Sequence, residues 1–123
     1  MRAVPRSNSN PEIAVRKVLH RLGLRFRLHR KDLPGTPDIV LRRYKSVIFV
    51  HGCFWHRHIG CAKATTPKTH IQFWNDKFKK NTKRDAKNEE TLRNMGWNIL
   101  TIWECQVKDT DTLEKLLRSY FKI

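Results

Sequence analysis

An eleven-residue segment, HGCFWHRHIGC at positions 51–61, contains three histidines and two cysteines together with a Phe and a Trp. Thiolate sulfur and imidazole nitrogen are ligands that zinc prefers, and imidazole also serves as a general acid or base. The segment directly follows an apolar run, SVIFV at residues 46–50, which is typical of a buried strand. The sequence therefore places its most reactive residue types at the end of a predicted strand.

Three of these residues have the spacing of a zinc site, because Cys53, His58 and Cys61 lie within nine positions. Cys105 follows a second predicted strand and completes a set of three cysteines and one histidine, which matches the charge and tetrahedral geometry of structural zinc. The alternative is that Cys53 and Cys105 are ordinary buried cysteines and that His58 is exposed to solvent. We expect structural zinc, because burial alone does not explain why all three cysteines would meet at one end of a sheet.

A carboxylate and a histidine lie at the open end of a predicted hairpin. Asp38 begins the apolar run at residues 38–41, and His51 follows the run at residues 46–50. A tight turn between the two runs would place Asp38 opposite Val50 and beside His51. Carboxylate and carbonyl oxygens are ligands that Mg²⁺ prefers, and a nearby imidazole can activate water or protonate a leaving oxygen.

Two more residues extend this candidate hydrolytic centre. Glu12, in the first turn of a predicted helix, is a further acidic group, and His56 lies five positions after His51. Taken singly, Asp38 fits a turn or cap residue and His51 fits a histidine without a role. Their combination favours chemistry over chance placement.

Aromatic residues accompany both constellations. Phe54 and Trp55 directly follow the first candidate zinc ligand, and Trp74 lies at helical spacing from Phe78. Aromatic rings on a metal-stabilised loop of a basic protein can insert between stacked bases. The alternative is that the rings cover the core, which is the default for Trp74 and Phe78.

The charge of the chain predicts its partner. Lys and Arg number 26 and Asp and Glu number 11, which gives the 123 residues a formal net charge of +15. This length fits one domain with its own core, and this charge favours a polyanion such as nucleic acid. No apolar stretch approaches the roughly 18 residues of a membrane span, and residues 1–10 lack the apolar centre of a signal peptide. We expect a cytoplasmic, nucleoid-associated protein without membrane contact.

Hydrophobic periodicity and capping residues predict one α/β domain. The expected helices are residues 10–23, 70–95 and 111–121, and the expected strands are residues 26–28, 38–41, 46–50 and 97–104. Gly23 and Gly96 suit helix ends, and Asp111 with Glu114 has the spacing of a capping box.

The long central helix has a topological consequence. A helix that connects strands 46–50 and 97–104 predicts a right-handed crossover, which makes the two strands parallel and neighbouring. Their C-terminal ends then lie at the same edge of the sheet, where open α/β sheets bind ligands. This edge would receive residues 51–61 and residues 104–105.

Four stretches in sequence order, LPGTPDIV, FVHGCFWH, FWNDKFKKNTKRD and GWNILTIWEC, resemble the very short patch repair (Vsr-type) DNA mismatch endonucleases. The resemblance spans nearly the whole chain and implies one endonuclease domain over residues 1–123. It implies a restriction-endonuclease-like fold, with a central mixed β-sheet flanked by helices and a zinc-stabilised loop. It also implies Mg²⁺-dependent nicking of double-stranded DNA, 5′ to the mispaired T of T:G mismatches that arise from deamination of 5-methylcytosine.

The resemblance also implies roles for individual residues. Asp38 would be the principal Mg²⁺ ligand, with the backbone carbonyl of Val50 as a second ligand. The remaining catalytic residues would be His51 at the hydrolytic centre, His56 as its assistant, and Glu12 and Asp85 as supporting groups. The structural zinc would be bound by Cys53, His58, Cys61 and Cys105, and the DNA-intercalating residues would be Phe54, Trp55 and Trp74.

The chain departs from the family pattern in three places. Position 50 is Val where Thr is familiar, and residues 49–51 stand where restriction enzymes have an acidic residue, any residue and Lys. The loop HRHIGC is one residue longer than the pattern, which leaves His56 as an alternative to His58 in the zinc site.

Two other functions share parts of this sequence pattern. A zinc-stabilised DNA-binding module without catalysis would explain the charge, the aromatic residues and the cysteines, but it would not need Asp38 with His51. A restriction-type nuclease would share the chemistry without the mismatch requirement. We expect a monomeric mismatch endonuclease that acts alongside other mismatch-repair proteins.

Overall fold

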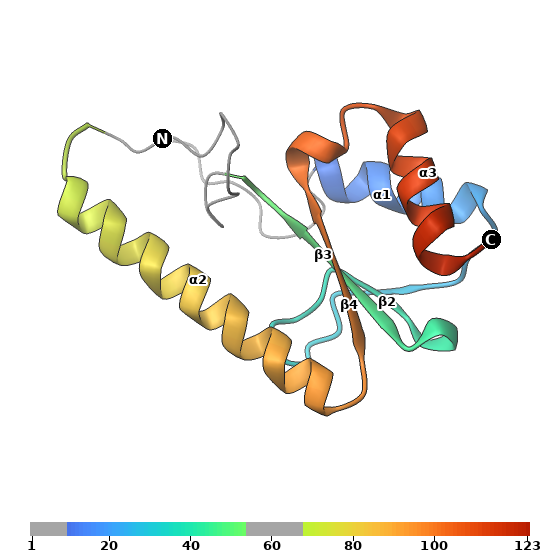
Figure 1. The fold of residues 1–123 in the computed structure, drawn as a ribbon, viewed down its shortest axis with the longest axis horizontal. Coiled ribbons are helices and arrows are strands. Elements are labelled where there is room, and N and C mark those ends of the chain that lie inside the picture. Colours follow the sequence, from blue (N-terminus) through green and yellow to red (C-terminus); the bar gives the residue numbers. More distant parts are fainter. Residues whose placement is uncertain (1–9, 54–67) are drawn as a thin grey trace.

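The structure is a computed structural model that describes residues 10–53 and 68–123 (Figure 1). Its helices are α1 (Asn10–Arg21), α2 (Ile71–Asn94) and α3 (Thr110–Phe121), with two short 3₁₀ helices at Arg42–Tyr44 and Glu104–Gln106. Its strands are β1 (Arg27–Leu28), β2 (Ile39–Leu41), β3 (Ser46–His51) and β4 (Asn98–Trp103). The predicted mixed α/β domain is confirmed at this level.

The four strands form one sheet in the order β1-β2-β3-β4. The first two pairs are antiparallel, and β3 pairs with β4 in parallel, so that His51 lies opposite Trp103. Since α2 is the connection between β3 and β4, the parallel pairing follows from the crossover that the sequence predicts. The C-terminal ends of β3 and β4 therefore meet at one edge of the sheet.

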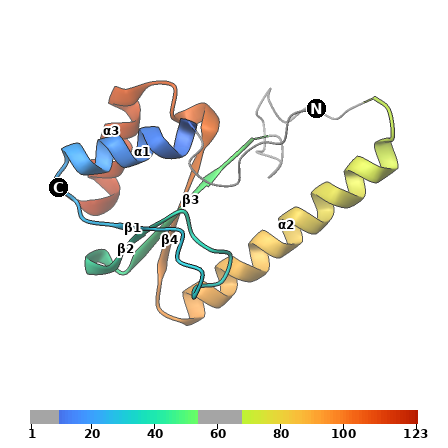
Figure 2. The same ribbon diagram turned by 180° about the vertical axis from the view of Figure 1, so that it is seen from behind.

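Apolar residues on both faces of the sheet build two cores, because successive strand residues point to opposite faces. On one face, α1 and α3 pack over Ile39, Ile48 and Ile102, all fully buried. On the other face, Val47 packs with Trp97 in a smaller cluster. Figures 1 and 2 show α1 and α3 together on one side and α2 extending away from the sheet.

The long helix α2 is anchored mainly at its C-terminal end. Leu92 is fully buried, whereas most residues in the first half of the helix are exposed. The helix stops at Gly96, whose φ of 91° is the left-handed conformation that suits glycine. Its 24 residues span about 36 Å, so α2 presents a long solvent-facing surface.

Two local predictions are wrong. Ile39 pairs with Ile48, which places Asp38 one residue away from the predicted register opposite Val50. The connection is longer than a tight turn, because it contains a 3₁₀ helix and Lys45 in a left-handed conformation with φ 51°. The cap of α3 is Asp109, which accepts hydrogen bonds from the backbone N–H groups of the next turn, so the expected Asp111–Glu114 capping box is not used.

None of the helices in residues 10–53 and 68–123 is long and apolar enough to span a membrane.

Candidate active site

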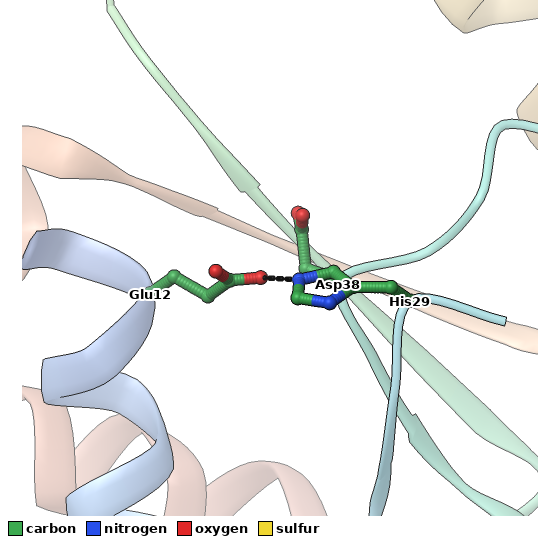
Figure 3. A group of neighbouring side chains, drawn as sticks. All are labelled: Glu12, His29 and Asp38. Atoms are coloured by element: carbon green, nitrogen blue, oxygen red, sulfur yellow. Dashed lines mark hydrogen bonds and ion pairs between the residues drawn. The ribbon is translucent and has the colours of Figure 1, made fainter. Parts of the chain in front are cut away.

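Three side chains from different elements meet beside the sheet. Glu12 lies in the first turn of α1, His29 follows β1 directly, and Asp38 precedes β2. One potential ligand atom from each residue lies within 4.8 Å of the other two. Figure 3 shows the Glu12 and His29 side chains end to end, with the Asp38 carboxyl group beside them. Carboxylates with an imidazole beside them are groups that commonly surround a divalent metal ion.

Glu12 is a buried acid whose two oxygens both have partners. Its exposed fraction is 1%, so its charge needs compensation inside the protein. Arg16, one helical turn later, places Nη2 3.0 Å from Oε2, and His29 places Nε2 2.5 Å from Oε1. Because a carboxylate only accepts hydrogen bonds, His29 Nε2 carries the shared hydrogen. Glu12 is therefore fixed from two sides.

Asp38 is held by the neighbouring strand. The backbone N–H of Val50 donates a hydrogen bond of 2.7 Å to Oδ2 of Asp38. Burial is the main reason that the pKa of Asp38 rises to about 6; the Val50 N–H opposes the rise and Glu12 adds to it. The raised pKa means that the Asp38 anion lacks sufficient compensating charge. A divalent cation would supply that charge, so the donor set fits the predicted Mg²⁺.

His51 is packed between two rings at the end of β3. It is 8% exposed, and its ring centroid lies 5.6 Å from that of Phe49 and 5.3 Å from that of Trp103, the latter edge-on at 75°. These ring contacts fix the imidazole plane, which suits a group that must transfer a proton in one direction. These contacts do not test the catalytic role of His51, which stays a prediction.

Two of the predicted zinc ligands lie at adjacent strand ends. Cys53 is fully buried, and its backbone N–H donates a 3.1 Å hydrogen bond to Oε1 of Glu104, the residue before Cys105. This bond ties the segment after β3 to the segment after β4. The other predicted ligands and loop residues, His56, His58, Cys61, Phe54 and Trp55, lie outside the described residues.

The remaining predicted site residues lie on α2. Asp85 is half-buried there and does not belong to the group formed by Glu12, His29 and Asp38. Trp74 is half-buried, stacks on Phe78 at 5.9 Å and meets the exposed Phe73 edge-on at 5.4 Å. Trp74 therefore belongs to an aromatic group near the start of α2. This packing agrees with the structural alternative and is also compatible with a DNA contact.

His29 is the site residue that the sequence interpretation missed. Its place follows from the pairing of β1 with β2, which the sequence pattern alone did not specify: Leu28 lies opposite Ile39, so the next residues outward, His29 and Asp38, flank the same end of the pair. The His29 backbone N–H donates to the Asp38 carbonyl at 3.1 Å.

The exposed surface of α2 is strongly basic. Its exposed basic residues are Lys77, Lys79, Lys80, Lys83, Arg84, Lys87 and Arg93. Positive side chains along a protruding helix are suited to the phosphates of a nucleic-acid backbone. A group of carboxylates and a histidine beside a cationic helix suits an enzyme that cleaves nucleic acids, because the first can take part in metal-assisted hydrolysis and the second can contact phosphates.

Comparison with known proteins specifies this class. Residues 1–63 match the model of the DNA mismatch endonuclease Vsr family. The chain is 48% identical over 119 residues to the type II nicking enzyme V.XorIIP of Xanthomonas oryzae pv. oryzae. The aligned residues cover 97% of this chain and 87% of that enzyme. The chain belongs to the DNA mismatch endonuclease Vsr family, and it is therefore a nuclease.

Two further relatives agree. The chain is 43% identical over 114 residues to the type II nicking enzyme V.NmeAIP of Neisseria meningitidis, with 89% of this chain and 81% of that enzyme covered. It is 39% identical over 113 residues to DNA mismatch endonuclease Vsr of Escherichia coli K12, with 92% and 72% covered. Membership in this family confirms the predicted endonuclease class. It disfavours the alternative of a DNA-binding module without catalysis.

Proposed function

We propose that the protein is a strand-specific, Mg²⁺-dependent endonuclease that nicks double-stranded DNA 5′ to the mispaired T of a T:G mismatch. Such mismatches arise when 5-methylcytosine loses its amino group. The proposal names the substrate and the bond that is cut, which family membership alone does not specify. It agrees with the names of three relatives, one a mismatch endonuclease and two nicking enzymes. The observation that carries the chemistry is the half-buried carboxylate of Asp38, which belongs with Glu12 and His29 to a group whose potential ligand atoms lie within 4.8 Å of one another.

Asp38 and the backbone carbonyl of Val50 would hold the Mg²⁺ ion. When bound, the ion stabilises negative charge on the scissile phosphate and favours a hydroxide-like water as the attacking group. The Val50 N–H orients one oxygen of Asp38 and so fixes the carboxylate beside the place where an ion would bind. Glu12, fixed by Arg16, would accept a hydrogen bond from water next to that ion.

His51 would move a proton at the reacting phosphate, and His56 would assist through phosphate or water contacts. An imidazole suits this role because its protonation changes near neutral pH. The packing of His51 against Phe49 and Trp103 would restrict its side-chain motion and so limit the cost of orienting it. Asp85 would support these groups from α2.

The segment after β3 would be stabilised by structural zinc bound to Cys53, His58, Cys61 and Cys105. The hydrogen bond from Cys53 N–H to Glu104 supports the part of this proposal that brings the two strand ends together. A metal-fixed loop would hold Phe54 and Trp55 as a wedge into the base stack, with Trp74 lining the opened step. The whole would form a monomeric, restriction-endonuclease-like domain that cooperates with other mismatch-repair proteins.

Mapping of the cut tests the proposed reaction. Duplexes that carry one T:G pair, labelled on one strand or the other, are incubated with the protein in Mg²⁺ or in a chelator. We expect one break, 5′ to the mispaired T, only in the T-containing strand and only with Mg²⁺. Breaks in both strands at a fixed matched sequence would instead indicate a restriction-type nuclease.

A further inference from the structure

His29 connects the two acidic residues of the candidate active site. Its backbone N–H donates to the carbonyl of Asp38 at 3.1 Å, and its Nε2–H donates to Oε1 of Glu12 at 2.5 Å. The first bond lies where β1 ends and β2 begins, and the second joins His29 to α1 (Figure 3). His29 therefore links the helix that carries Glu12 to the strand that follows Asp38.

The second oxygen of Glu12 is occupied as well. Arg16 Nη2 lies 3.0 Å from Oε2, so Glu12 is held between a guanidinium group and an imidazole. A carboxylate that is 1% exposed and bound at both oxygens has little freedom to turn towards an ion. Asp38 lies beside it, with Oδ2 accepting the hydrogen bond from the Val50 N–H.

We propose that His29 is a positioning residue that holds Glu12 in place beside the metal ligand Asp38. The inference rests on the proposed function, because it assigns Asp38 to Mg²⁺. His29 acts through Glu12: with the Nε2–H bond in place, Glu12 presents a fixed acceptor for water at the ion. Without that bond, Glu12 loses the partner of Oε1 that this structure shows, and its carboxylate is held less firmly.

The distance between the two side chains argues against His29 as a direct ligand. Neighbouring ligands of one Mg²⁺ ion stand about 3 Å apart, because each lies about 2.1 Å from the ion at right angles. His29 Nε2 and Glu12 Oε1 are 2.5 Å apart, which fits a shared hydrogen and not a shared ion. A positioning role also predicts that metal preference does not depend on His29, since hard oxygen ligands alone would select the ion.

The backbone at His29 allows a sharp pair of substitutions. Its φ is 47°, in the left-handed region, where Asn is among the best tolerated residues. The amide nitrogen of Gln can occupy the position of Nε2, whereas the shorter amide of Asn reaches only as far as Nδ1. His29→Asn therefore keeps the left-handed backbone conformation but loses the hydrogen bond to Glu12. His29→Gln can keep that hydrogen bond, although Gln fits the left-handed conformation less well.

The test measures Mg²⁺-dependent nicking for both variants, with His20→Ala as a matched control because His20 is an exposed histidine on α1. Loss of a group that orients a metal site typically costs about 10- to 100-fold in activity or metal affinity. We expect a loss of this size for His29→Asn and a clearly smaller loss for His29→Gln, with His20→Ala unchanged. An Asn variant as active as the wild type would overturn the proposal, and so would a Gln variant as impaired as the Asn variant.

Calorimetric titration of the DNA-free protein with Mg²⁺ and Mn²⁺ supplies a readout other than activity. We expect His29→Asn to weaken the binding of both ions by a similar factor. A selective loss of Mn²⁺ binding would identify His29 as a direct ligand and overturn the positioning role. Wild-type protein that binds Mg²⁺ at Asp38 but does not nick DNA would contradict the proposed function while leaving the metal-binding comparison intact.

Discussion

The backbone N–H of Val50 donates a 2.7 Å hydrogen bond to the side chain of Asp38, although the two residues are not paired in the β2–β3 ladder. The side chain thus continues the strand pairing beyond the first residue of β2. This bond fixes one carboxylate oxygen and leaves the anion without full compensation, as the raised pKa shows.

Asp38→Asn should reduce nicking by about 100-fold or more, because the variant loses the fixed anionic ligand of the metal. The Asn side-chain oxygen can still accept the Val50 N–H, so the fold should be retained. DNA affinity should stay the same or rise, since a negative charge near the phosphates is removed. Single-turnover nicking and a binding titration check this, and an Asp38→Asn enzyme with wild-type rates would remove Asp38 from the catalytic site.

The pH dependence of stability should also report on Asp38. Because its pKa in the folded protein is about 6, above the ordinary Asp value of 3.8, the folded protein binds more protons than the unfolded chain between these two pH values. Asp38 therefore lowers the free energy of unfolding as pH rises through about 4 to 6, and the penalty is full above pH 6. Its size is at most about 3 kcal/mol.

Comparison of wild type with Asp38→Asn isolates this effect, because Glu12, Arg16 and His29 face the site in both proteins. In chelator, Asp38→Asn should be more stable than wild type at pH 7, and the difference should shrink towards pH 4. Urea unfolding at several pH values measures it. A difference that does not change with pH would contradict the undercompensated Asp38 anion.

His51→Ala should be nearly as damaging to nicking as Asp38→Asn if the imidazole transfers the proton. The variant also loses ring contacts with Phe49 and Trp103, so its thermal midpoint is measured in parallel. His51→Phe, which keeps an aromatic ring between these two residues, is the matched control for packing. Nicking at wild-type rates by the Phe variant would show that His51 is structural.

The protein should contain one zinc ion per chain. Binding of structural zinc contributes directly to folding free energy, so Cys105→Ser should lower the thermal midpoint as well as activity. Elemental analysis of protein purified without chelator measures the zinc content. Protein that is folded and free of zinc would rule out the proposed Cys53, His58, Cys61 and Cys105 site.

Trp55→Ala should weaken nicking at T:G by roughly five- to a hundredfold, because loss of one base–aromatic stack costs about 1–3 kcal/mol. A wobble pair is easier to unstack than a Watson–Crick pair, so a wedge favours mismatched DNA. Zinc content serves as the control for loop integrity and should not change. Equal nicking by wild type and Trp55→Ala at limiting enzyme would show that the ring only packs.

The elements set by local patterns and chain topology were predictable from the sequence. The parallel pairing of β3 with β4 followed from a helix between two apolar runs, and the end of α2 followed from Gly96. Such features depend on periodicity and on the handedness of crossovers, which leave few alternatives.

The site was less predictable, because it depends on contacts between residues far apart in sequence. The role of His29 in holding Glu12 requires the position of α1 against the β1–β2 end, which no periodicity in the sequence specifies. The register of β2 against β3 shifted because Arg42–Tyr44 form a 3₁₀ helix in place of a tight turn. Asp109 caps α3 because its side chain reaches the backbone N–H groups two and three residues later, at 3.0 and 3.4 Å, ahead of the predicted cap.

The most direct test of the proposed function is the ratio of nicking rates on two duplexes that differ only in one pair, T:G or T:A, in Mg²⁺ at limiting enzyme. We expect cleavage of the T strand to be at least about 10-fold faster in the T:G duplex than in the T:A duplex, because the mismatched step costs less to open. Asp38→Asn should cut the T:G duplex about 100-fold or more slowly than wild type. Equal rates on the two duplexes would contradict mismatch recognition, and the protein would then be a nuclease of this family with a different substrate requirement.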